Sequence, residues 1–61
     1  MTAREREVLR LVADGASNGE IAEQLIIAVG TVKRHINNLF STLGVQSRTQ
    51  AVRAARDLQL F

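Results

Sequence analysis

Apolar residues recur three and four positions apart in four stretches of the 61-residue chain. Such spacing indicates helices that bury one side against a core. The clearest stretch is 29–43, whose apolar positions are Val29, Val32, Ile36, Leu39, Phe40 and Leu43. The whole pattern predicts helices over about 3–14, 18–25, 29–43 and 48–58. We therefore expect an all-α fold, a compact four-helix domain.

Capping residues mark the boundaries of these helices. A Ser or Thr followed three residues later by Glu or Gln forms a capping box, which satisfies two free backbone N–H groups. Such pairs open the first, second and fourth helices: Thr2 with Glu5, Ser17 with Glu20, and Ser47 with Gln50. Gly15 and Gly44 are suited to end the first and third helices. The third helix lacks a cap, because Ala28 precedes it, and such an Ala usually costs about 1 kcal/mol.

Residues 26–28 form a short corner between the second and third helices. A Gly often begins such a corner, but this chain has the β-branched Ile26. Because β-branched residues rarely adopt a positive φ, we predict ordinary backbone dihedrals in the turn. We also place Ile26 and Ile27 in the core.

A polar face lies opposite the apolar stripe of the third helix and consists of Gly30, Lys33, Arg34, Asn37 and Ser41. Lys and Arg bond to guanine and Asn to adenine, and an α-helix fits the major groove of B-DNA. This helix carries two cations and no carboxylate, and it follows a short capped helix and a corner, as recognition helices do. The sequence therefore predicts a helix-turn-helix in which Lys33, Arg34 and Asn37 contact DNA bases. The plainer alternative is a solvated surface face.

Three further polar residues lie near predicted helix starts. Helix N-termini attract phosphate through their free N–H groups and the helix dipole. Asn18, Thr31 and Arg48 lie near the starts of the second, third and fourth helices. We predict that they contact the DNA backbone, which would position the protein without specifying a base sequence.

Charge is distributed unevenly along the chain. The formal net charge is +2, but residues 1–30 carry −2 and residues 31–61 carry +4. A basic second half is typical of proteins that bind a polyanion. A basic helix on a membrane surface is the alternative, but it would need bulky apolar residues, with Trp or Phe at the edge of its polar face. Here the apolar side of the third helix has core partners elsewhere in the chain.

Several other functions lack the residues they require. The chain has no Cys, so it has neither disulfides nor thiolate metal sites. His35 is the single His and offers too few ligands for zinc, so we expect it to pack or to lie near a phosphate. No nucleophile with a base, Gly-rich phosphate loop or carboxylate cluster is evident. We therefore expect no enzyme, cofactor or metal. No membrane span or signal peptide is indicated.

Ordered motifs along nearly the whole chain resemble a known family. They are Thr2-Ala-Arg-Glu-Arg-Glu-Val-Leu9, Ser17-Asn-Gly-Glu-Ile-Ala22, Gly30-Thr-Val-Lys-Arg-His-Ile36, Leu43-Gly-Val45 and Arg48-Thr-Gln-Ala-Val52. Their order and spacing are similar to those of the LuxR-type (GerE-type) helix-turn-helix domain of bacterial transcription regulators. Ala28 departs from that family, which often has Ser or Thr at this position.

The resemblance implies sequence-specific binding of double-stranded DNA in transcription regulation, with helix 29–43 in the major groove. It also implies a homodimer on DNA, formed through the fourth helix. Val52, Ala55 and Leu58 are the candidates for that contact, although spacing alone leaves open whether they pack inward instead. RNA polymerase is a further expected partner, and the expected location is the bacterial cytoplasm, at the nucleoid.

The resemblance also concerns what lies beyond these residues. Residues 1–61 would form the C-terminal domain of a longer regulator whose N-terminal domain senses a signal, with a short natural regulator as the alternative. The main alternative function is a small helical protein-interaction module whose basic third helix binds an acidic partner. Asn37 beside two cations favours DNA, because pairing with an acidic partner does not require an amide.

Overall fold

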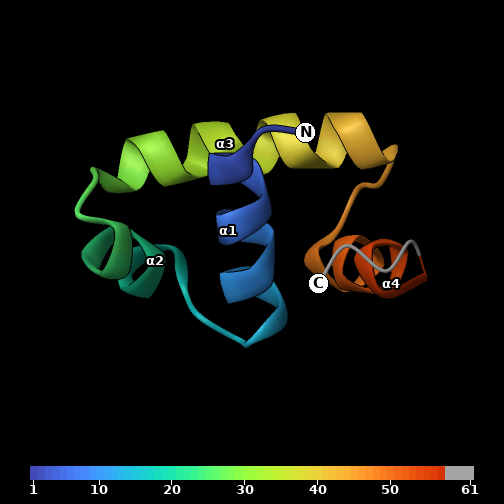
Figure 1. Ribbon diagram of the computed structural model, residues 1–61, viewed down its shortest axis with the longest axis horizontal. Coiled ribbons are helices and arrows are strands. Elements are labelled where there is room, and N and C mark those ends of the chain that lie inside the picture. Colours follow the sequence, from blue (N-terminus) through green and yellow to red (C-terminus); the bar gives the residue numbers. More distant parts are fainter. Residues whose placement is uncertain (58–61) are drawn as a thin grey trace.

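The computed structural model describes residues 1–57, which form four helices. These are α1 (Ala3–Ala13), α2 (Asn18–Leu25), α3 (Val29–Leu43) and α4 (Arg48–Asp57). Figure 1 shows α3 along one side of the molecule, with α1 beneath its middle and α2 and α4 on either side of α1. The predicted all-α helix-turn-helix fold is confirmed. The first helix ends one residue earlier than predicted, and Leu58 lies outside the described residues.

The core lies where α1 crosses α3. α1 packs against the other three helices, and α3 packs against α2 and α4. The buried side chains are all apolar: Val8, Leu9, Val12, Ile21, Ala22, Val32, Ile36, Leu39, Ala51 and Ala55. The small side chains on α4 allow that helix to approach α1 and α3 closely. One side of α3 is therefore held by the core, and its other side faces outward.

Two of the three predicted capping boxes are complete. The hydroxyl of Thr2 accepts the Glu5 N–H at 3.1 Å, and Glu5 Oε1 accepts the Thr2 N–H at 3.3 Å. Ser17 and Glu20 make the same pair at 3.1 and 2.8 Å. Hydrogen bonds from Thr2 lower the pKa of Glu5, and those from Ser17 lower the pKa of Glu20.

The third box is only half formed. Ser47 Oγ accepts the Gln50 N–H at 3.1 Å, as predicted. Gln50 Oε1 instead accepts the N–H of Gln46 at 2.9 Å. The Gln50 carboxamide therefore accepts from the backbone N–H group of Gln46, the residue before the cap. α4 still begins at the residue that the sequence predicted.

The predicted backbone of the corner is wrong. Ile26 has φ 56° and ψ 52°, a left-handed conformation, and its side chain is 90% exposed rather than in the core. The hydrogen bonds explain why: Ile26 N–H donates to Glu23 and Ile27 N–H donates to Ala22. This pattern is a Schellman closure, which requires a left-handed residue where the helix ends. Ile27 is half-buried and does pack against the core.

The same closure ends α1 at Gly15 and α3 at Gly44. Gly15 donates to Val12 and the following N–H donates to Leu11, whereas Gly44 donates to Ser41 and the following N–H donates to Phe40. Both glycines have positive φ. Ile26 thus takes a role that glycine fills elsewhere in the chain.

We predict that Ile26→Gly stabilises the domain. The exposed side chain leaves no cavity, and relief of the left-handed conformation gains about 1 to 2 kcal/mol. The entropy of the unfolded glycine offsets roughly 0.5 to 1 kcal/mol of that gain. Urea denaturation should show a net rise in unfolding free energy of about 0.5 to 1 kcal/mol. Gly44→Ala is the matched control and should lose stability, because open space surrounds that site and only backbone strain is added. A loss for both variants would contradict the prediction.

We also predict that Ala28→Ser stabilises the domain. Ala28 has φ −71° and ψ 149°, close to the dihedrals of Ser17, but α3 has no side-chain cap. A Ser hydroxyl there can accept the Thr31 N–H and should add about 1 kcal/mol. Thermal unfolding should then shift upward by roughly 4 to 8 °C. Ser17→Ala should lower the thermal midpoint by a similar amount. An unchanged midpoint for Ala28→Ser would refute the prediction that a side-chain cap at position 28 stabilises α3.

Candidate nucleic-acid interface

The outward side of α3 carries all three residues predicted to contact bases. Lys33, Arg34 and Asn37 are exposed, whereas Val32 and Ile36 on the opposite side are buried. Residues three and four positions apart are neighbours on a helix surface, so Asn37 lies one turn beyond both cations. The structure therefore brings these three polar side chains together on one face.

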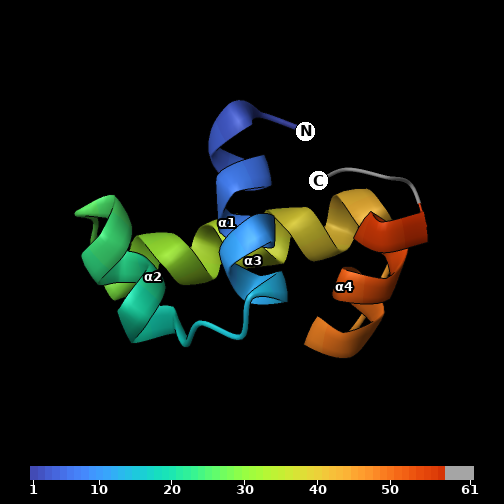
Figure 2. The same cartoon turned by 60° about the horizontal axis from the view of Figure 1, so that its bottom comes forward.

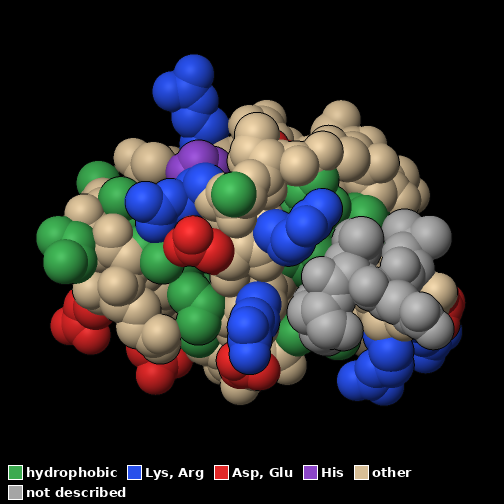
Figure 3. All heavy atoms as spheres, viewed as in Figure 1, with side chains coloured by type: hydrophobic (Ala, Val, Ile, Leu, Met, Phe, Trp, Pro, Cys, Tyr) green, Lys and Arg blue, Asp and Glu red, His purple; other side chains and the backbone are tan. Residues whose placement is uncertain are grey.

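Opposite charges do not neutralise this face. α3 contains no Asp or Glu, and within residues 1–57 neither of its cations forms an ion pair. Figure 3 shows a Lys or Arg side chain projecting above α3, whereas most acidic side chains in this view lie lower, over α1 and α2 and beside α4. The outward face of α3 is consequently open to an anionic partner.

The residues predicted to contact the DNA backbone lie at the starts of helices. Thr31 is exposed in the first turn of α3. Asn18 is half-buried and is the first residue of α2. Arg48 is half-buried at the start of α4, and its guanidinium donates to Asn18 Oδ1 at 2.9 Å and to the Ala16 carbonyl at 2.8 Å. The sequence did not predict these contacts, because their partners are 30 and 32 residues away.

His35 differs from its polar neighbours on α3 because it is half-buried. In the part of the chain that the structure describes, no three His, Asp or Glu side chains gather closely enough to hold a metal ion. Because His35 is half-buried, it lies at the boundary between the core and the outward face of α3.

The residues predicted for dimer contact have different surroundings. Val52 is half-buried and lines an open hollow on α4 with Thr49, Arg53 and Arg56. Ala55 is 0% exposed and is therefore a core residue. The prediction that it contacts a second copy of the domain is corrected, because a fully buried side chain is not accessible to another chain. Leu58 falls outside the described residues. Helical spacing could not distinguish these surroundings, because Val52 and Ala55 are three positions apart and are therefore neighbours on the helix surface.

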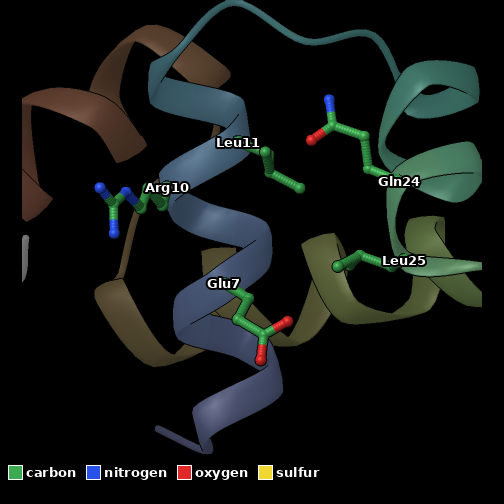
Figure 4. A pocket seen from close by; sticks show the side chains of 5 residues that line it. All are labelled: Glu7, Arg10, Leu11, Gln24 and Leu25. Carbon is green, nitrogen blue, oxygen red and sulfur yellow. The ribbon is translucent and has the colours of Figure 1, made fainter.

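A shallow groove between α1 and α2 is lined by the residues Glu7, Arg10, Leu11, Gln24 and Leu25 (Figure 4). Its volume is about 190 Å³, which is below the roughly 300 to 1,000 Å³ of typical small-molecule sites. Leu11 and Leu25 point toward one another across the groove, whereas Arg10 points away from it.

None of the described helices is long and apolar enough to cross a membrane.

Comparisons with known proteins agree with this geometry. The family model for "Bacterial regulatory proteins, luxR family" matches residues 1–55. The CsgBAC operon transcriptional regulatory protein of Escherichia coli K12 is 51% identical over 57 residues, covering 93% of this chain and 26% of that protein. The chain thus spans about a quarter of the length of that curated relative.

Solved structures have the same fold. The transcription factor GerE superposes with a TM-score of 0.91 at 38% identity, covering 98% of this chain and 90% of that one. The response regulator ChrA of a heme-sensing two-component system has a TM-score of 0.95 at 43% identity, covering 98% of this chain and 30% of that one. This chain belongs to the luxR family of bacterial regulatory proteins and has the helix-turn-helix fold of GerE.

Proposed function

We propose that α3 enters the major groove of duplex DNA and contacts bases through Lys33, Arg34 and Asn37. The observation that carries this proposal is the outward face of α3, where two cations and an amide are exposed and no carboxylate is present. The helix has 15 residues and is thus roughly 22 Å long, enough to present several side chains to base edges in the groove.

The arrangement of these three residues suits direct recognition of bases. Lys33 lies four positions and Arg34 three positions before Asn37, so each cation is a neighbour of Asn37 on the helix surface. Arg and Lys donate to guanine O6 and N7, whereas Asn pairs with both N6 and N7 of adenine. Together they would distinguish neighbouring base pairs, which supports sequence-specific binding.

Contacts to the DNA backbone would hold α3 in register. The first turns of α2 and α3 present Asn18 and Thr31, and helix N-termini favour phosphate. Arg48 lies beside Asn18, to which it donates a hydrogen bond. These contacts would fix the orientation of the domain and leave the choice of sequence to the outward face of α3.

Two copies of the domain would bind an inverted repeat. Val52, Thr49, Arg53 and Arg56 lie on the outer side of α4, and this side forms the proposed contact between copies. Two-fold symmetry of the protein would then match two half-sites about one helical turn apart.

We further propose that the domain binds DNA without catalysing a reaction and that RNA polymerase is a partner. The proposed location is the bacterial cytoplasm, at the nucleoid. Residues 1–61 would be one DNA-binding domain of a longer, signal-sensing regulator.

We predict that Lys33→Ala, Arg34→Ala and Asn37→Ala each weaken binding to the preferred duplex by about 1 to 3 kcal/mol. Each variant should also relax the preference at one base pair. Selection of bound duplexes from a random pool identifies the preferred site, and titration of that site and of a scrambled duplex measures the losses. Arg10→Ala removes one exposed cation from α1 and serves as the control for net charge.

Salt dependence gives the second readout. The logarithm of the binding constant should fall linearly with the logarithm of salt concentration, with a slope set by the number of phosphate contacts.

Equal losses of affinity for the preferred and the scrambled duplex would show that Lys33, Arg34 and Asn37 do not recognise bases. No enriched site, together with tight binding to an acidic protein surface, would favour the protein-interaction module instead.

A further inference from the structure

Arg48 joins the start of α4 to the segment that leads into α2. Its Nη1 donates to Asn18 Oδ1 at 2.9 Å, and its Nη2 donates to the Ala16 carbonyl at 2.8 Å. Figure 2 shows the beginning of α4 near this segment. Within residues 1–57, α2 and α4 do not pack against each other. The Arg48 side chain therefore makes a connection that helix packing does not provide.

The contact with Arg48 fixes which way the Asn18 amide faces. A guanidinium only donates hydrogen bonds, so the Asn18 atom that meets it is the oxygen, Oδ1. The amide nitrogen, Nδ2, then lies on the other branch of the side chain, and no acceptor for it is found among the described residues. Asn18 thus keeps two side-chain N–H donors free at the first position of α2.

The first turn of α2 also offers free backbone donors. The first N–H groups of an α-helix have no partner inside the helix. The capping box uses those of Ser17 and Glu20, which leaves the backbone N–H groups of Asn18 and Gly19. Gly19 is exposed and adds no side chain that would cover them. A phosphate at this end of α2 could therefore accept from the backbone and from Asn18 Nδ2 together.

We propose that Arg48 is a positioning residue for DNA-backbone binding, which holds Asn18 so that Nδ2 donates to a phosphate. This inference rests on the proposed function, because it assigns how one of its backbone contacts is held in place. Arg48 itself is half-buried and its two terminal nitrogens donate inward. Its effect on DNA therefore passes through Asn18, and a direct contact between Arg48 and phosphate is the competing outcome.

The shape of the guanidinium is essential to this role. Arg presents several donors in a rigid planar fork, whereas the Lys ammonium is a compact charge on a flexible stem. Arg48→Lys keeps the charge but cannot hold the amide and the carbonyl in the same fixed directions. Comparing Arg48→Lys with Arg48→Ala therefore separates positioning from charge.

The test measures binding of the 61-residue chain to a duplex of random sequence, across a range of salt concentrations and at a temperature where circular dichroism shows every variant folded. Arg48→Ala, Arg48→Lys and Asn18→Ala should each raise Kd about three- to tenfold, as expected for the loss of one hydrogen bond. The salt slope of both Arg48 variants should equal that of the wild type. The double variant Arg48→Ala with Asn18→Ala should bind no more weakly than Asn18→Ala alone.

Asn18→Asp separates binding from folding. The carboxylate still accepts the hydrogen bond from Arg48, so the thermal midpoint should stay at or above that of the wild type. Binding should fall at least as far as for Asn18→Ala, because the donor is lost and a negative charge faces phosphate. Arg10→Ala is the control for the removal of one cation elsewhere on the surface.

Three results would overturn the inference. Wild-type binding by Arg48→Lys, with a salt slope lowered by about one in Arg48→Ala, would show direct contact with a phosphate. Losses that multiply in the double variant would show that the two residues act independently. A wild-type chain that binds no duplex even at low salt would contradict the proposed function itself, and this inference with it.

Discussion

Burial of one side of α3 against α1 is the constraint on which the rest of the structure depends. Val32 and Leu39 are fully buried against a core that includes Val8 and Leu9 of α1. Burying an aliphatic side chain of this size contributes about 1.5 to 3 kcal/mol. A turn of α3 about its axis by one residue would place Lys33 in the core, where an unpaired charge is very costly. The apolar stripe therefore determines which residues face outward.

α2 and α3 end with the same backbone closure. A left-handed residue ends the preceding helix at Ile26, and another ends α3 itself at Gly44. At the first of these, the closure directs Ile27 toward the core and leaves Ile26 exposed. An aliphatic residue in this conformation is strained, and the packing of α2 and α3 maintains it. The corner is thus set by tertiary structure and not by the local preference of Ile26.

Features that depend on near neighbours could be predicted from the sequence. Helix periodicity and the caps at Thr2 and Ser17 are local, and so is the outward face of α3. The contacts of Arg48 could not be predicted, because Asn18 lies 30 residues away and nothing in the spacing links the two. Ala55 failed for another reason: a small residue at helical spacing suits a core and an interface equally well. The conformation of Ile26 was missed because a closure overrode its intrinsic preference.

Folding and the proposed recognition of DNA bases use nearly separate sets of residues. The described core contains no buried polar or charged side chain, whereas Lys33, Arg34 and Asn37 are all exposed. Substitutions at exposed positions usually change stability by less than about 0.5 kcal/mol. The residues of the proposed base contacts can therefore change while the four-helix fold is retained. Arg48 is different, because it is half-buried and bonded to the segment that begins α2. A change there alters the scaffold and the proposed phosphate contact together, which constrains that position more strongly than those on the outward face of α3.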